Sequence, residues 1–386
     1  MRKLPQAPRC SLRSVVFTVL ATLSLAMLIA PVGAAAETNR NAYVTNNING
    51  TVSVIDPRTG SLVATISGFS HPFCVAVSPN GKLLYVCNTT NTVSVVDTET
   101  NTVTATIAVN GTGFIGQEGS GPNIAFNRRG DRAYLVTSGG GVNSELIVID
   151  TRNNTILSRT SFGKTFLLAV AVAPNGDNVY LGTEGSPLSQ SGILVVDADG
   201  DNPTQTIALG HLISNLAVSR NGDRLYASDI SGLVGGQSGV LVVDTDTNSV
   251  VTSVPLPNNT FVTGLALTPN GRHLYAADFT LTRPANSTVT VIDTKDNSVD
   301  ATIAANGTTL TSLAATTDGR RILATNAVLS TTVDSNLLVI GTRDNTIDNS
   351  IPTGLFSANV ATQPARGRGD DDDRDRDHDD HGDHDH

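Results

Sequence analysis

The chain has 386 residues, a formal net charge of −10, no tryptophan and only sixteen Phe or Tyr residues. An acidic chain without a clustered Lys/Arg stripe, and with few aromatic rings for base stacking, is a poor partner for nucleic acid. We therefore expect a role in protein, glycan or small-molecule chemistry.

Residues 1–36 have the composition of a secretory signal peptide. Their apolar run from Val15 to Ala30 precedes small residues at Ala34–Ala36, so we expect cleavage after Ala36. The alternative is a retained membrane anchor, but the run is shorter than the ~20 residues that a span needs. No later stretch is long and apolar enough to cross a bilayer, which predicts a secreted or periplasmic chain. Four basic residues precede the run: Arg2, Lys3, Arg9 and Arg13.

A short pattern recurs along residues 37–365. A turn signal of the SPNGK or APNGD kind occurs six times and is followed by a short apolar run, and six runs end in Asp, such as TVSVVD. Such self-similarity is typical of repeat architectures. Tyrosine or leucine marks one position per copy, at spacings of 42 to 49 residues. The seven marks are Tyr43, Tyr85, Tyr134, Tyr180, Tyr226, Tyr275 and Leu323.

Each copy is predicted to hold four antiparallel strands, because its segments are short and rich in Val, Ile, Leu and Thr. In the second copy we place the strands, named A to D, at 72–78, 83–88, 92–97 and 102–108. Seven such units predict an all-β, seven-bladed propeller. The chain begins on a B strand at 42–46 and ends on an A-like segment at 357–364. We therefore expect the last strand to complete the first blade and close the ring.

One position of the A strands is alanine in all seven copies, and we interpret it as a packing position where blades converge near the axis. The alanines are Ala76, Ala125, Ala171, Ala217, Ala266, Ala314 and Ala361.

With its LYVCN-type strands, VSVVDTETNTV-type hairpins and VAVSPNG-type turns, the chain resembles the YVTN-repeat, or YncE-like, seven-bladed propellers. The resemblance covers nearly all of residues 41–364. It implies an exported protein that mostly binds rather than catalyses. Similar repeats also form parts of periplasmic redox enzymes, and distant relatives include lactonases. A metal-dependent lactonase-like hydrolase or a propeller subunit of a dehydrogenase is therefore the alternative function. No catalytic residues of the family can be carried over.

The loops differ between the two faces expected of the propeller. The A–B and C–D connections are tight turns, whereas the B–C loops lengthen from the third copy on, and one D–A connection, 109–121, is long. D–A and B–C loops open on the same face, which indicates a binding surface for a protein, glycan or small ligand. The candidate ligand-binding residues there are His71, Glu118, Glu184, His211, Asp229, Asp278 and Arg283. Two imidazoles with carboxylates could hold a divalent cation, although solvated loop residues are the simpler interpretation.

Two further sites are suggested by spacing. Asp197, Asp199 and Asp201 alternate as in calcium loops, but the sixth position is Asn202 where such loops have Gly, and no acidic twelfth ligand follows, so an Asx-type turn is the alternative. Cys74 and Cys87 are predicted to face each other across the A and B strands. A disulfide and a buried pair of free thiols both fit that placement.

Residues 366–386 form an acidic tail with ten Asp and four Arg, and we expect it to be disordered. Its carboxylates and imidazoles could collect divalent cations loosely, or the tail only solubilises the chain. No other cofactor is indicated, and we expect a monomer. The tail histidines are His378, His381, His384 and His386.

The tetrad Tyr-Val-Thr-Asn at 43–46 recurs in modified form in every copy, and its first and last positions have different expected roles. Its tyrosine is expected to be a packing residue, because Leu323 replaces it in the seventh copy. Its last position is polar in every copy and is expected to open at the rim of the loop face. The seven residues at that position are Asn46, Asn88, Thr137, Thr183, Asp229, Asp278 and Asn326.

Overall fold

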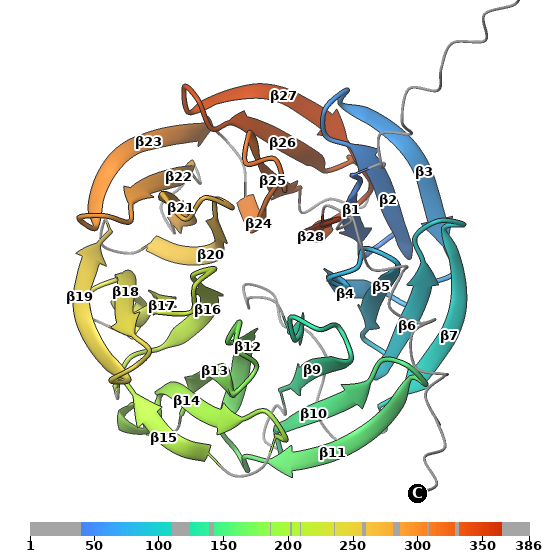
Figure 1. Ribbon diagram of the computed structural model, residues 1–386. Helices are drawn as coiled ribbons and strands as arrows, with labels where there is room; N and C mark the ends of the chain where they lie inside the picture. Colours follow the sequence, from blue (N-terminus) through green and yellow to red (C-terminus); the bar gives the residue numbers. More distant parts are fainter. Residues whose placement is uncertain are drawn as a thin grey trace, which may run out of the picture. The chain divides into compact units, whose positions relative to one another are not determined.

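The computed structural model describes residues 40–109, 123–138, 143–185, 187–200, 203–208, 210–234, 236–256, 260–280, 286–306, 309–328 and 332–364. These residues form seven four-stranded antiparallel sheets, which surround a central axis as blades (Figure 1). The all-β, seven-bladed propeller predicted from the repeat is confirmed. No helix among the described residues is long and apolar enough to span a membrane.

Strand A of each blade lies nearest the axis and strand D lies outermost (Figure 1). In order A to D, blade 1 holds β28 (Ser357–Thr362), β1 (Ala42–Asn46), β2 (Thr51–Asp56) and β3 (Ser61–Ser67). Blade 2 holds β4 (Pro72–Val77), β5 (Leu83–Asn88), β6 (Thr92–Asp97) and β7 (Thr102–Ala108), and blade 3 holds β8 (Ile124–Phe126), β9 (Arg132–Thr137), β10 (Glu145–Asp150) and β11 (Thr155–Ser161). Blade 4 holds β12 (Phe166–Val172), β13 (Asn178–Glu184), β14 (Gly192–Asp197) and β15 (Pro203–Ile207).

Blades 5 to 7 repeat the arrangement. Blade 5 holds β16 (Ile213–Val218), β17 (Arg224–Asp229), β18 (Gly239–Asp244) and β19 (Ser249–Pro255), and blade 6 holds β20 (Thr260–Leu267), β21 (His273–Thr280), β22 (Asn286–Asp293) and β23 (Ser298–Asn306). Blade 7 holds β24 (Thr309–Ala315), β25 (Arg321–Ala327), β26 (Asn336–Gly341) and β27 (Thr346–Pro352). Two short 3-10 turns, η1 (Leu188–Gln190) and η2 (Ser231–Val234), lie in B–C loops.

Strand β28 closes the ring as predicted, because it pairs with β1 in blade 1 and places Ala361 opposite Tyr43. The backbone N–H of Gln363 donates to the Asn41 carbonyl at 2.9 Å. The Gln363 amide reaches the neighbouring blade, where Nε2 donates to the Gly81 carbonyl at 2.7 Å. The last strand therefore joins blade 1 internally and ties it to blade 2.

The tyrosine column packs each blade against the next. All six tyrosines and Leu323 are buried, and each lies opposite the alanine of its own A strand, for example Tyr85 opposite Ala76. Three tyrosine hydroxyls also reach the C–D turn of the following blade, with Tyr85 and Tyr275 donating to Asn154 and Asn345. Tyr134 donates to a backbone carbonyl in the same place. The column thus combines packing with a polar tie between blades.

Cys74 and Cys87 are directly opposite each other on β4 and β5. The structure joins them in a disulfide, with 5.0 Å between the two Cα atoms. Both residues are fully buried in the core that packs blade 2 against blade 3.

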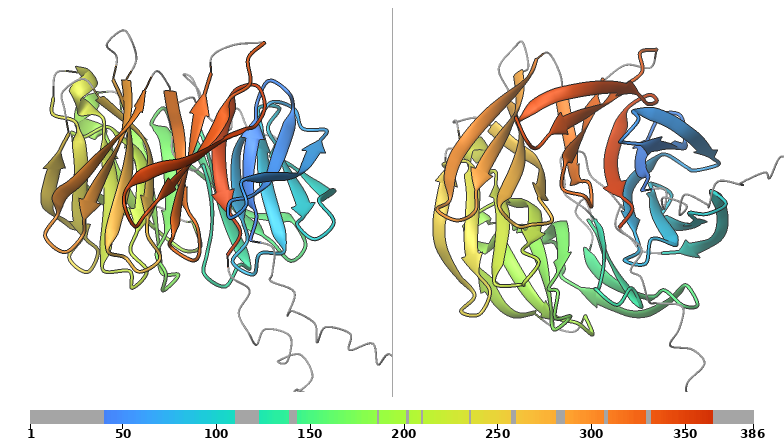
Figure 2. Two further views of the ribbon diagram at one scale, coloured as in Figure 1. Left: turned by 90° about the horizontal axis from the view of Figure 1, so that it is seen from above. Right: turned by 45° about the horizontal axis from the view of Figure 1, so that its top comes forward.

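The connections divide between two faces. The A–B and C–D turns lie on one face, which we call the turn face, and the B–C and D–A loops lie on the opposite loop face (Figure 2). Both ends of the described chain lie on the turn face. Arg40 is two residues before the start of β1, and Pro364 is two residues after the end of β28.

Candidate functional site

The long B–C loops rest on a column of buried serines that the sequence analysis missed. The serines occur at the start of strand C in the five blades whose B–C loops are long, directly before the strand in four blades and as its second residue in blade 6. In blade 4, Ser191 Oγ accepts the Gly185 N–H at 2.8 Å, and in blade 7, Ser335 Oγ accepts the Val328 N–H at 3.0 Å. The bases of these two loops are therefore fixed to strand C. The serines are Ser144, Ser191, Ser238, Ser287 and Ser335, and the recurrent Ser at the start of each later C strand was the available signal.

Above this base, the structure brings together two of the predicted ligand-binding residues, His211 and Asp229. His211 Nδ1 lies 2.6 Å from Asp229 Oδ2. The Asp229 side chain is 4% exposed, whereas the His211 side chain is 42% exposed. Asp229 is itself held by η2, since its Oδ1 accepts hydrogen bonds from both the backbone N–H and the hydroxyl of Ser231.

This geometry fixes how His211 can act. A carboxylate on Nδ1 orients the imidazole and leaves Nε2 for a partner outside the protein. The pair does not form a serine-hydrolase triad, because the Ser231 hydroxyl is bonded to the carboxylate rather than to the imidazole. His211 is thus an oriented hydrogen-bonding group at the loop face.

The other predicted ligand-binding residues do not join this pair. His71 is exposed, and its backbone has a left-handed φ of 49° before β4 in blade 2. Glu184 is exposed at the end of β13. Glu118 and Arg283 lie outside the described residues. Within the described part of the chain, no three His, Cys, Asp or Glu side chains form a group that could hold a metal ion.

The polar column that ends each B strand is buried and does not open at the rim. All seven members are at most 4% exposed. In blades 1 and 2 the asparagine donates from Nδ2 to two hydroxyls on strand C, as Asn88 does to Thr92 at 3.1 Å and Ser94 at 3.0 Å. In these two blades the column therefore ties strand B to strand C.

Asp278 occupies that column in blade 6, where it is a carboxyl in an amide's place. Its Oδ2 accepts hydrogen bonds from the hydroxyls of Thr288 and Thr290. Its Oδ1 is buried and has no hydrogen-bond partner among the described residues. Burial disfavours the charged form and raises the pKa of Asp278 to about 7, although the two threonine hydroxyls oppose the shift.

We expect Asp278→Asn to remove a pH-dependent loss of stability. With a folded pKa near 7 and an unfolded pKa near 4, only the folded state holds the proton between those values, so stability falls as the pH rises through this window. The loss in the wild type amounts to at most roughly 4 kcal/mol at neutral pH. Denaturant unfolding between about pH 4 and pH 8 should show the variant gaining on the wild type as the pH rises.

The reverse substitution, of asparagine by aspartate, can be made at the equivalent position of blade 2. Asn88→Asp places a carboxyl at the equivalent buried position of blade 2 and should create the same pH-dependent loss. Parallel stability curves for wild type and Asp278→Asn across the window would show that Asp278 stays charged in the folded protein.

The turn face carries a second feature, which depends on how neighbouring A–B turns meet. In three turns, the proline at the second position packs on the glycine at the fourth position of the A–B turn in the next blade. Pro79 lies 3.1 Å from where a Cβ atom on Gly130 would be, and Pro174 and Pro269 stand likewise at 3.3 Å from Gly222 and Gly319. These prolines fill the junctions between blades 2 and 3, 4 and 5, and 6 and 7.

Arginine replaces the proline in two turns, and clefts lie at those junctions. Arg128 precedes the junction of blades 3 and 4, and Arg220 that of blades 5 and 6. Nothing lies within 4 Å of a Cβ position on the facing Gly176 or Gly271. Cleft 3/4 has a volume of about 740 Å³ and cleft 5/6 about 630 Å³.

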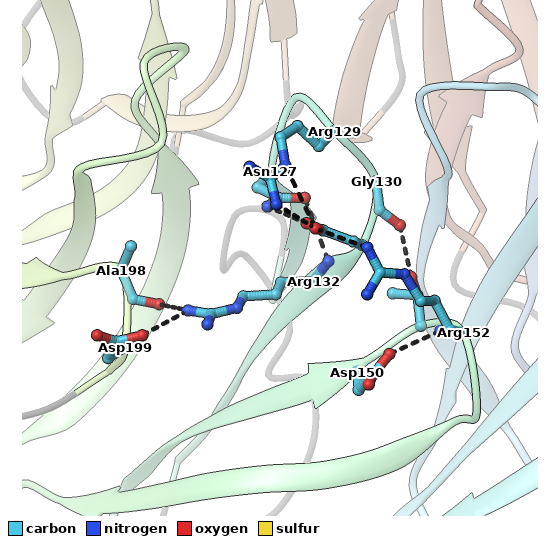
Figure 3. A network of polar contacts seen from close by, with 10 residues as sticks. Asn127, Arg129, Gly130, Arg132, Asp150, Arg152, Ala198 and Asp199 are labelled. Carbon is cyan, nitrogen blue, oxygen red and sulfur yellow. Dashed lines mark hydrogen bonds and ion pairs between the residues drawn. The ribbon is translucent and has the colours of Figure 1, made fainter. Parts of the chain in front are cut away.

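Most of the charged groups in cleft 3/4 pair with one another (Figure 3). Asp131 accepts hydrogen bonds from the Asn127 amide at 2.6 Å, from Arg129 at 2.8 Å and from Arg152 at 3.4 Å. The Asn127 amide, and then the two arginines, lower the pKa of the Asp131 carboxyl. Arg132 reaches blade 4, where it pairs with Asp199 at 2.7 Å. Asp199 belongs to the predicted calcium loop, in which Gly200 N–H closes a turn on the Asp197 carbonyl. Asp201 lies outside the described residues.

Comparisons with known proteins identify relatives of the fold only. No family model matches the chain, and no curated protein matches it. Among solved structures, hydrazine synthase from Kuenenia stuttgartiensis has a TM-score of 0.64 and 18% identity, over 78% of this chain and 91% of that one. The dihydro-heme d1 dehydrogenase NirN has a TM-score of 0.56 and 17% identity, over 86% and 67% of the two chains. A functionally unknown protein from Desulfotomaculum acetoxidans DSM 771 has a TM-score of 0.67 and 13% identity, over 84% and 99%.

The shared feature is the propeller. At these identities the likeness shows the fold alone, so the activities of these proteins are not carried to this chain.

Proposed function

We propose that the chain is an exported, monomeric binding protein of the YVTN-repeat (YncE-like) kind, which holds a polar ligand on its loop face. The ligand is a protein, a glycan or a small molecule. The repeat motifs and the signal-like residues 1–36 support the family and the export. The buried disulfide is consistent with an oxidising compartment.

One observation carries the binding role, namely the His211–Asp229 pair. A buried carboxylate holds the imidazole in one orientation, while almost half of the imidazole side chain remains accessible. Fixing a polar group before the ligand arrives lowers the entropy cost of binding. The serine column gives the surrounding loops a rigid base, as is usual for binding loops on a scaffold.

The test is a panel of oligosaccharides and small polar fragments screened by ligand-observed NMR. We expect hits on the wild type that are lost in His211→Ala and kept in Arg343→Ala, an exposed arginine of the turn face. Hits that survive His211→Ala, or a panel without hits, would contradict the proposal.

Metal analysis separates this proposal from the enzymatic alternative. A tightly bound stoichiometric ion in protein that ends at Ala365, lost in His71→Ala and His211→Ala, would replace it with a metal-dependent hydrolase.

We further propose that the tail histidines and aspartates bind divalent cations weakly, as an accessory function beside ligand binding on the loop face. Calorimetry with Ni²⁺, Zn²⁺ and Ca²⁺ on the intact chain and on the chain that ends at Ala365 decides this, since identical isotherms would exclude the tail.

A further inference from the structure

Charge on the turn face is sorted by radius. The six A–B turns, each taken together with the first residue of strand B, surround the axis, and we call them the inner turn ring. They hold nine Lys or Arg and four Asp: Lys82, Arg128, Arg129, Arg132, Arg220, Arg224, Arg272, Arg320 and Arg321, against Asp131, Asp177, Asp223 and Asp318. The C–D turns, each taken together with the last residue of strand C, form the outer turn ring, whose described residues include eleven acids and four cations. The centre of this face is therefore basic and its periphery is acidic.

Four arginines of the inner turn ring have no ion-pair partner among the described residues, namely Arg128, Arg220, Arg272 and Arg320, and the backbones of the last two are held within their turns. Arg129 and Arg152 pair with Asp131, and Arg132 and Arg224 pair with acids of the outer turn ring. Arg128 and Arg220 are exposed, and no hydrogen bond or ion pair joins either to another described residue. Both line cleft 5/6, and Arg128 also lines cleft 3/4. These are the two arginines that replace the junction prolines.

We propose that the chain's own acidic tail, residues 370–385, docks on the inner turn ring through Arg128 and Arg220. The tail has ten Asp and two Arg in that stretch, so it carries a net charge of −8. It follows Pro364, which ends the innermost strand of blade 1 on this same face. Five residues, 365–369, separate the two and can span about 17 Å when extended.

The charge pattern favours this place over others. Acids of the outer turn ring repel a polyaspartate and confine it to the centre, where arginine and carboxylate form charge-assisted hydrogen bonds. On the loop face, Lys164 is the only Lys or Arg among the described residues of the loops. The covalent link raises the tail's local concentration to about the millimolar range, so modest affinity is sufficient. A docked tail shields the basic centre from other polyanions.

The first test uses a fluorescent synthetic peptide of residues 370–385 and the chain that ends at Ala365. We expect anisotropy to show binding that weakens by at least about tenfold between roughly 0.05 and 0.5 M salt. The double variant Arg128→Gln/Arg220→Gln should weaken it to a similar degree. The matched control Arg58→Gln/Arg343→Gln changes two arginines of the outer turn ring and should have little effect. In the intact chain the attached tail competes, and the peptide should bind about tenfold more weakly.

The second test locates the tail in the intact protein. Only three lysines follow residue 37, all exposed: Lys82 on the inner turn ring, Lys295 on the outer turn ring and Lys164 on the loop face. Zero-length carbodiimide cross-linking should join tail Asp residues chiefly to Lys82, with the yield reduced in Arg128→Gln/Arg220→Gln. The proposal is overturned if the peptide does not bind, if both double variants weaken it equally, or if the Lys82 yield is unchanged by the loss of the two arginines.

Discussion

A chain that ends after Gly354 is expected to lose the stable propeller. This truncation removes β28, whose pairing with β1 completes blade 1. Without it, the backbone groups along one edge of β1 lose their partners, and the hydrophobic cores that β28 shares with its neighbours are opened. The ring would then lack the innermost strand of blade 1, which lies between β24 of blade 7 and β4 of blade 2. We expect aggregation, or a broad unfolding transition at a much lower temperature.

The matched control ends after Ala365, which keeps β28 and the Gln363 contacts with Asn41 and Gly81. It should melt as the intact chain does. Calorimetry and size-exclusion chromatography compare the two truncations. A soluble chain ending at Gly354 that unfolds cooperatively at the wild-type temperature would show that β28 does not close the ring.

Tyr275→Ala is expected to cost about 3–5 kcal/mol of unfolding free energy, as truncation of a large buried aromatic side chain does. Tyr275 is fully buried in the core that packs blade 6 against blade 7. Its hydroxyl donates to Asn345 at 2.7 Å, and burial raises its pKa to about 12. The alanine variant loses both the packing and this tie, and leaves a cavity between the blades.

Two milder changes separate these contributions. Tyr275→Phe keeps the ring and removes the hydroxyl, at an expected cost of about 1 kcal/mol. Tyr275→Leu introduces the residue type that blade 7 has at the equivalent position, Leu323. It should lower the free energy of unfolding by less than Tyr275→Ala does. Urea unfolding ranks the three. A Tyr275→Ala stability within about 0.5 kcal/mol of the wild type would mean that the column does not hold the blades together.

The fold could be predicted from the sequence because its determinants are local and repeated. Turn residues of the SPNG kind fix each A–B connection, and strand residues between turns fix the rest. In blade 2, three of the four strands have the predicted bounds, and β4 ends at Val77, one residue earlier than expected. The alanine opposite each tyrosine, and the closing strand, followed from comparing copies within one chain.

The functional surfaces could not be predicted in the same way, because they consist of residues from distant segments that only the assembled ring brings together. Asp229 was named as a loop residue beside His211, but only the structure shows the two in contact. The position of the polar column near the end of strand B predicts a rim, yet the column is buried, and Asn46 and Asn88 bond hydroxyls of strand C. The cations of the inner turn ring are scattered singly through the sequence. Their concentration around the axis, and the two clefts beside Arg128 and Arg220, arise only when the blades are assembled.

Closure by β28 also sets an order on folding during synthesis. The partner of β1 lies some three hundred residues later in the chain, so blade 1 stays three-stranded until the final segment has emerged. Throughout that interval β1 presents an open strand edge, which can pair with other extended chains. Blade 1 is thus the first blade to be made and the last to be completed, and a stalled or shortened chain exposes the edge most prone to aggregation.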